Sequence, residues 1–209
     1  MEVNYKSIRY KTAIEFLLPR HYSGRKPNVV YSFGAYSEGE LIAVCTYGIP
    51  ASRPLCVGVM GKESYRKVIE LNRLYVLEDK KDFILSQFVS WTLRTLKTKN
   101  LCVVSYADTA MSHVGSIYQA CNFLYTGKTP KRTDKFTEGN KHCRHYDKDA
   151  IETKRKVRSA KHRYIYFTGS KTEVRKMKSF LNYKIQPYPK GKKENYKEGF
   201  ILQPEVYDV

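Results

Sequence analysis

Two consecutive stretches at the centre of the chain indicate its fold: Leu101-Cys-Val-Val-Ser-Tyr-Ala-Asp108 and Gly115-Ser-Ile-Tyr-Gln-Ala-Cys-Asn-Phe-Leu-Tyr-Thr-Gly127. The first is a short apolar run, which predicts a buried strand over 101–106. The second predicts a short helix over 112–121 that leads into a strand at 123–125, and we expect Gly127 to break that strand. Strand, helix and strand in this order favour an α/β unit.

The elements before this centre extend the same pattern. Residues 68–76 alternate like a strand, and we expect Ile69, Leu71, Arg73 and Tyr75 to share one face. From Asp82 apolar residues recur at three- and four-residue spacing up to Leu96, which predicts an amphipathic helix. Two β-prone runs around residues 37–39 read as a hairpin. The sequence therefore predicts an α/β (α+β) domain with a mixed, mostly antiparallel sheet flanked by helices.

The chain after Gly127 has a different composition. Residues 128–160 are polar and strongly basic, which predicts a long loop or mobile arm. A strand at 163–167 and a helix at 171–181 are expected to follow. We divide the chain into a core, residues 1–127, and a basic extension, residues 128–209, packed on or continuous with that core.

The charge of the chain favours a polyanionic partner. The formal net charge is +18, from 38 Lys and Arg against 20 Asp and Glu, and residues 127–209 hold 22 of the basic and 10 of the acidic residues. Such a field supports salt-dependent binding of phosphates. Many of the 18 tyrosines have basic neighbours and could stack on bases. A basic surface that serves only solubility is the alternative.

The cysteines and the apolar runs bear on the compartment. Cys45, Cys102 and Cys121 lie in apolar runs, so we expect buried free thiols in a reducing compartment. The sequence shows no signal-peptide pattern and no apolar run long enough for a membrane span. We expect a cytoplasmic protein without membrane contact. No oligomeric state follows from the sequence.

The segment from Leu71 to Gly127 resembles the second half of a GNAT acyltransferase. Tyr118 takes the position of a tyrosine that is common on that superfamily's last helix, and Asn122-Phe123 replaces its Gly-Phe pair. The pyrophosphate loop should lie between the strand at 68–76 and Phe88, but no glycine occurs there. The resemblance implies an acetyl-CoA-type donor, held by the helix start and by Tyr75, Val76, Lys80 and Lys81.

Four motifs in order resemble the Mom family of phage DNA-modifying proteins over about residues 16–190. They are His21-Tyr22-Ser23-Gly24-Arg25-x-Pro27, Glu70-Leu71-x-Arg73, Ser105-Tyr106-Ala107-Asp108 and His113-x-Gly115-x-Ile117-Tyr118-Gln119-Ala120. The resemblance implies a GNAT-like fold in a phage-encoded enzyme of the bacterial cytoplasm. It further implies that adenine in duplex DNA becomes a carbamoylmethyl derivative, which protects phage DNA from restriction, with an acetyl-CoA-type donor and an iron ion as candidate cofactors.

The same resemblance implies site residues, and each has a structural alternative. The candidate catalytic residues are Asp108, Tyr118, Arg73, Glu70 and Ser105. Asp108 could instead cap the next helix, for which Ser112 is the nearer cap. Tyr118 could simply pack, and Arg73 could form a structural ion pair with Glu70. Iron would be bound by imidazole, phenolate and carboxylate groups, from His21, Tyr22 and Asp108. A lone histidine is more often structural.

Basic residues of the first motif and of the chain after Gly127 are expected to contact DNA around an extruded adenine. The candidates are Arg25, Arg132, Arg155, Lys156, Arg158, Lys161, Arg163 and Lys190. The cluster His142-Cys143-Arg144-His145 lacks a second ligand pair at zinc-finger spacing, so we assign it to DNA contact. Two other functions stay open: a conventional N-acetyltransferase acting on a small amine, RNA or protein, and a non-catalytic DNA-binding protein.

Overall fold

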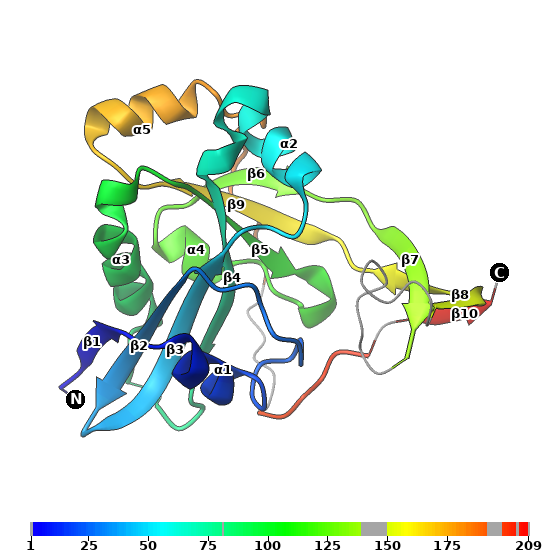
Figure 1. Cartoon of the computed structure of the whole chain (residues 1–209), viewed down its shortest axis with the longest axis horizontal. Helices are drawn as coiled ribbons and strands as arrows, with labels where there is room; N and C mark the ends of the chain where they lie inside the picture. The colour runs from blue at the N-terminus through cyan, green and yellow to red at the C-terminus, as the bar shows by residue number, and fades with distance from the viewer. Residues whose placement is uncertain (1, 81, 139–149, 192–197, 204, 209) are drawn as a thin grey trace.

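The computed structural model describes residues 2–80, 82–138, 150–191, 198–203 and 205–208. Its strands form a seven-stranded sheet, in the order β1-β2-β3-β4-β5-β9-β6, and a three-stranded sheet, in the order β10-β8-β7 (Figure 1). The β4–β5 pair is parallel and the other pairs are antiparallel. The predicted mixed, mostly antiparallel sheet is therefore confirmed.

The seven-stranded sheet contains the predicted strands and one that was not predicted. Its strands are β1 (Asn4–Ser7), β2 (Tyr31–Ser37), β3 (Glu40–Gly48), β4 (Val68–Val76), β5 (Cys102–Asp108), β6 (Leu124–Lys128) and β9 (Lys161–Phe167). The predicted hairpin is β2–β3. Its two-residue turn has positive φ at Glu38 (52°) and Gly39 (83°). This conformation matches the twist of the flanking strands and favours glycine at the second position. The unpredicted strand is β1, and the position of the predicted β9 between β5 and β6, next to the edge of the sheet, was not expected from the sequence.

Helices cover both faces of this sheet (Figure 1). One face carries α3 (Leu85–Thr95) and α4 (Ser116–Ala120), which bury apolar side chains in the largest core cluster. In α3 the buried residues recur at helical spacing: Phe88, Val89, Thr92 and Leu93. This amphipathic helix was predicted. The other face carries α1 (Tyr10–Leu17), α2 (Arg53–Ser64) and α5 (Lys171–Lys178), in two smaller clusters.

A β-bulge in β4 corrects one prediction. Tyr47 pairs with Leu71 and Thr46 pairs with Arg73, so Asn72 is an extra residue. Before the bulge Ile69 and Leu71 belong to the largest cluster, but after it Leu74 and Val76 pack there, while Tyr75 belongs to the cluster of α1. The expectation that Ile69, Leu71, Arg73 and Tyr75 share one face is therefore wrong.

Three expectations around the central segment are also corrected. The helix begins at Ser116 instead of residue 112, because Ser112 (φ 51°) and Gly115 (φ 80°) are left-handed. Ser112 therefore does not cap it. Gly127, with φ 91°, lies inside β6, where the register with β9 shifts, and does not break the strand.

The described parts of the basic segment 128–160 consist mainly of strands, so the prediction of a long loop is wrong for them. It contains β7 (Arg132–Thr137) and β8 (Ala150–Arg158), and β10 (Val206–Asp208) pairs with β8. We call these three strands the basic sheet. These strands were not predicted because their sequences are polar and lack the alternation of apolar and polar residues that indicates a half-buried strand. The proposed boundary at 127/128 falls at the end of β6, and β9 runs between β5 and β6.

Four cysteines of the described chain are free and buried, Cys45, Cys56, Cys102 and Cys121, as the sequence predicted for three of them. Burial raises the pKa of Cys45 to about 12 and keeps it a thiol. Within the described ranges no helix is long and apolar enough to cross a membrane. Residues 142–145, assigned to DNA contact from the sequence, lie outside the described residues.

Candidate active site

The two parallel strands at the centre of the sheet pair over only part of their length. Backbone pairing joins Val68–Glu70 to Cys102–Val104, although β4 continues to Val76 and β5 to Asp108. The strands diverge beyond this point (Figure 1). The Ser105 hydroxyl crosses the start of the gap and donates to the carbonyl of Leu71 at 3.0 Å. Beyond this point the two strands no longer pair with each other through their backbones.

Tyr118 lies beside this gap. It comes from α4, is buried, and packs its ring against Phe123 (5.4 Å between centroids) and Tyr164 (5.3 Å). Burial raises the pKa of Tyr118 to about 12, although a hydrogen-bonding interaction with Ser105 lowers it in part. The phenol therefore stays protonated at neutral pH and can donate a hydrogen bond or a proton.

Asp108 ends β5 and is held by three donors. The ammonium of Lys161, the hydroxyl of Ser159 and the backbone N–H of Ala110 (3.0 Å) all donate to its carboxylate. Burial raises the pKa of Asp108, but the charge of Lys161 and these hydrogen bonds outweigh burial and hold the pKa below its ordinary value. The carboxylate is therefore ionised. The bond from Ala110 also caps the 3₁₀ turn Thr109–Met111, so the Asp108 carboxylate is a cap, although of this turn and not of α4.

The loop after α1 brings two aromatic rings together. His21 stacks on Tyr22 with 4.5 Å between ring centroids, and Tyr22 meets His113 edge-on at 6.1 Å. Burial, and then the charges of Arg73 and His113, hold the pKa of His21 well below its ordinary value. The imidazole is therefore neutral at neutral pH. Its Nδ1 accepts from the backbone N–H of Ser23 at 3.2 Å.

A side-chain hydrogen bond from Arg73 connects this loop to β4, and the edge-on contact between Tyr22 and His113 connects it to the segment after β5. The N–H of His113 donates to the carbonyl of Asp108 at 3.1 Å. Arg73 donates through Nη2 to the carbonyl of Arg25 at 3.2 Å and through Nη1 to Asn72 at 2.6 Å. We call the resulting group the β4–β5 site; its members are His21, Tyr22, Glu70, Arg73, Ser105, Asp108, His113 and Tyr118.

Glu70 lies among basic residues of this site. Burial raises its pKa, and Arg73, Lys161 and Arg158 lower it in part. The bulge at Asn72 turns Arg73 out of strict alternation, so Glu70 and Arg73 interact electrostatically although three positions separate them. The structure thus links Glu70 with Arg73 and Ser105 with Tyr118, and Lys161, which binds Asp108, lies within electrostatic range of Glu70.

Three residues of this region were not assigned from sequence. Asn72 donates to the carbonyl of Asn28 at 2.6 Å and accepts from Thr46 at 2.7 Å, so it anchors the loop that carries His21. His113 occurs in a quoted motif, and that was the available signal. Ser159 had no signal, because its contact with Asp108 spans 51 residues.

The candidate donor-binding residues that the structure describes have different surroundings and do not form one group. Tyr75 packs against Phe16 of α1 at 6.1 Å, and Val76 packs in the largest core cluster on the opposite face. Lys80 forms salt bridges with Glu40 (2.9 Å) and Asp79 (3.2 Å). Lys81 lies outside the described residues. The first residue before α3, Ile84, provides no side-chain cap, so the helix's first amides keep their capacity for an anion.

The candidate iron ligands do not fit a metal site. Within the described ranges no three His, Cys, Asp or Glu side chains form a group that could hold a metal ion. The Asp108 carboxylate is engaged by Lys161 and Ser159, and Arg73 places a positive charge near His21. A cation would be repelled by that guanidinium. We therefore assign no step to iron.

The candidate DNA-contacting residues fall into two groups. Arg132 and Arg158 are exposed on the basic sheet, where Arg158 pairs with Asp134 at 3.4 Å; Arg155 is partly exposed there, and Arg25 and Lys190 are exposed elsewhere. The second group has internal contacts: Lys156 donates to Thr137 at 3.5 Å, Lys161 binds Asp108, and Arg163 donates to Thr126 and stacks 3.3 Å from the ring centroid of Tyr183.

Comparison with solved structures identifies the fold. An N-acetyltransferase from Staphylococcus aureus Mu50 matches with a TM-score of 0.51 and 13% identity, over 80% of this chain and 99% of that one. A putative acetyltransferase from Salmonella typhimurium, solved with acetyl-CoA, matches with a TM-score of 0.52 and 8% identity, over 80% of this chain and 94% of that one. The chain has the GNAT acetyltransferase fold, as predicted.

Sequence comparison extends to most of the chain. A curated relative, "Methylcarbamoylase mom" of Escherichia phage Mu, is 26% identical over 206 residues, which are 90% of this chain and 84% of the relative. The model of the Mom protein family matches residues 2–190, a range that contains every member of the β4–β5 site. This chain belongs to the Mom protein family, as its four motifs indicated.

Proposed function

We propose that this protein is a transferase that converts adenine in duplex DNA to an N-carbamoylmethyl derivative and so protects phage DNA from host restriction. Its family membership, the name of its phage Mu relative and its acetyltransferase fold support the proposal. The observation that carries it is the β4–β5 site, because its members lie within the family match and around strands that diverge.

An adenine in a duplex must leave the base stack to react. Its exocyclic amine is conjugated with the ring and paired, so extrusion costs a few kcal/mol and needs a pocket that stacks the base and binds its edge. The rings of His21, Tyr22 and His113 offer stacking surfaces beside the gap. The ionised Asp108 is a hydrogen-bond acceptor that can orient an amine directly or through Lys161 and Ser159.

Three side chains of the β4–β5 site differ in protonation state at neutral pH, and we assign their roles from this difference. Asp108 is anionic, Tyr118 is a protonated phenol and His21 is a neutral imidazole. We propose that Tyr118 donates a hydrogen bond to the bound donor, while Asp108 accepts one from the amine and orients it. His21 and Tyr22 form the wall that receives the base and keeps water out.

An acyl-CoA donor, when bound, would supply an activated two-carbon unit. The amino end of α3 would hold its pyrophosphate, because the helix lacks a side-chain cap there and its dipole favours an anion. Lys80 would contribute little, since Glu40 and Asp79 already neutralise it. The absence of glycine between Leu77 and Ile84 predicts weak, salt-sensitive binding.

The exposed cations of the basic sheet would hold the duplex. Arg132 and Arg158 lie directly opposite one another on β7 and β8, so two like charges share one face of the sheet. Like charges directly opposite one another are destabilising, and the salt bridge between Arg158 and Asp134 offsets one of the two charges. A phosphate backbone would offset the other without reading the base sequence.

Nucleoside mass spectrometry of DNA from bacteria that express the protein tests this proposal. A carbamoylmethylated adenine is expected with the wild type and not with Asp108→Ala at equal expression. Unmodified DNA together with an acetylated small amine, RNA or protein would favour a conventional N-acetyltransferase, the second candidate, which the fold alone supports. Unmodified DNA with tight duplex binding and no acetylated product would favour a non-catalytic binding protein.

A further inference from the structure

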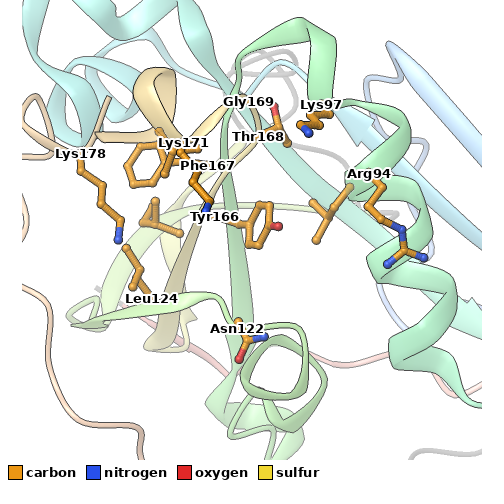
Figure 2. Close-up of a pocket in the computed structure, with 13 residues that line it drawn as sticks. Arg94, Lys97, Asn122, Leu124, Tyr166, Phe167, Thr168, Gly169, Lys171 and Lys178 are labelled. Carbon is orange, nitrogen blue, oxygen red and sulfur yellow. The ribbon is translucent and has the colours of Figure 1, made fainter. Parts of the chain in front are cut away.

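A basic groove lies at the opposite end of β9 from Asp108. Its volume is about 410 Å³, and residues of α3, β9 and α5 line it (Figure 2). We call it the β9 groove. Four of the lining side chains are basic and none of the described lining residues is acidic; the polar members used here are Arg94, Lys97, Asn122, Tyr166, Lys171 and Lys178.

The groove exists because β6 is shorter than β9. Leu124, the first residue of β6, pairs with Ile165, whereas β9 continues to Phe167. On its other edge β9 stays paired with β5 up to Phe167 and Cys102. In the described chain Tyr166 therefore has a paired strand on one edge only, and its ring lies between the basic side chains of α3 and those of α5 (Figure 2).

The cations of the groove have no acidic partners. None of Arg94, Lys97, Lys171 and Lys178 forms a salt bridge within the part of the chain that the structure describes. By contrast, Lys80 and Lys11 each have a carboxylate within 4 Å. Four like charges around one hollow repel each other, and a bound polyanion would remove that repulsion.

The distance between the groove and the β4–β5 site fits duplex DNA. Asp108 pairs with Lys161 at one end of the β5–β9 ladder, and Cys102 pairs with Phe167 at the other. Six strand residues span about 20 Å. This distance is about six base pairs along a duplex, at about 3.4 Å per step. Beyond Lys161 the chain leads into the basic sheet, so exposed cations lie at both ends of β9 (Figure 1).

We infer that the β9 groove binds the phosphate backbone of the same duplex, about six base pairs to one side of the adenine at the β4–β5 site. This inference rests on the proposed function for the position of the adenine. An extended, regularly charged backbone fits cations placed at both ends of β9, those of the groove at one end and the exposed arginines of the basic sheet at the other. An acidic protein would need no such spacing, and it becomes an outcome of the test.

The test uses a groove variant and a matched control. The variant Lys171→Gln/Lys178→Gln removes two groove charges from α5. The control, Lys6→Gln/Lys11→Gln, removes two exposed charges from β1 and α1, at the opposite edge of the sheet. Each pair is measured in the full-length protein by fluorescence anisotropy, on duplexes with one central A·T pair among G·C pairs. Two duplex lengths are used. A duplex of about 9 base pairs ends before it reaches the groove, whereas one of about 25 base pairs extends past it.

On the long duplex, the groove variant should flatten the slope of log affinity against log salt by about 1.8, which is about 60-fold in affinity at 0.1 M salt. On the short duplex it should match the wild type, and the control should match the wild type on both. Circular dichroism melts check folding, since exposed substitutions usually shift stability by less than about 0.5 kcal/mol.

Two results would overturn the inference: a wild-type slope for the groove variant on the long duplex, or an equal loss on both lengths. The first is also the result expected if an acidic protein occupies the groove. Mass spectrometry of the same duplexes tests the proposed function separately. A flattened salt slope for the groove variant without any modified adenine would support the inferred phosphate contact and reject the proposed function. Modified adenine with an unchanged salt slope would support the proposed function and reject the phosphate contact.

Discussion

Asp108 and Asp134 each pair with a basic residue, but the first pair belongs to the seven-stranded sheet and the second to the basic sheet. The side chains of Asp108 and Lys161 are 4% and 28% exposed, whereas those of Asp134 and Arg158 are 24% and 48% exposed. Asp108 has two further donors, Ser159 and Ala110, which hold its carboxylate from other directions. The same kind of ion pair is thus fixed in one sheet and solvated in the other.

This difference suits the two regions to different tasks, a reaction in one and the binding of a polyanion in the other. A buried, multiply bonded carboxylate keeps one geometry and one protonation state, as a reacting centre requires. Exposed cations adapt to a polyanion and exchange bound counterions for phosphates. Ser159 begins the two-residue link from β8 to β9 and donates to Asp108, so the two regions meet at this carboxylate.

The sharpest test of this comparison is to remove each aspartate in turn. Asp108→Ala should abolish DNA modification and destabilise the protein by about 2–3 kcal/mol, because Lys161 loses a largely buried partner. Asp134→Ala should cost less than about 1 kcal/mol and keep activity. Urea unfolding and nucleoside mass spectrometry measure both, with duplex binding expected to stay within a few-fold. Retained modification in Asp108→Ala would remove that residue from the site.

The second effect concerns the basic sheet. The triple variant Arg132→Ala/Arg155→Ala/Arg158→Ala should flatten the salt dependence of duplex binding by about 2.7 units, for three lost phosphate contacts. It should weaken binding to all sequences alike and leave the preferred adenine context unchanged. Salt titrations on two duplexes of different sequence measure this, with Arg9, Lys11 and Lys62 replaced by alanine as the control. A changed context preference would show that these arginines read bases.

A glycine beside α4 provides a third, smaller effect in the core. Gly115 has φ 80°, and a Cβ there would lie 2.4 Å from the Tyr164 ring. Gly115→Ala should cost about 3 kcal/mol from strain and overlap, and should displace Tyr118. Gly61→Ala, with φ 72° but open space, should cost about 1 kcal/mol. Urea unfolding compares the two, and equal losses would show that the Tyr164 contact yields easily.

The smallest effect is a pH dependence of stability. The folded-state pKa of His21 lies below its unfolded value, so the unfolded chain binds the additional proton. Its contribution is fully present above about pH 6.5 and is lost as pH falls through that value, by up to about 1.4 kcal/mol per pH unit. His21→Gln should make the stability profile flatter between about pH 7 and pH 5. Identical slopes in urea unfolding would show that His21 is not shielded from protonation.

Much of the site was predictable because its members lie in short, ordered motifs. Ser105 and Asp108 lie on one strand and Tyr118 lies on the following helix, and both elements were predicted from short apolar patterns in the sequence. Glu70 and Arg73 were recognised, but their common environment depends on the bulge at Asn72. A bulge is one extra residue in a ladder, and alternation in one strand does not reveal it without the partner strand.

The sequence by itself determined the helices and strands with strong periodicity, the free thiols, the surplus of positive charge and the family motifs. These depend on residue type and short spacing, which act within a segment. Tertiary structure alone decided that β9 lies between β5 and β6, and that Lys161 and Ser159 meet Asp108 across more than 50 residues. Polar strands such as β7 and β8 carry no apolar alternation, so their pairing depends on which sheet edges the rest of the chain leaves open.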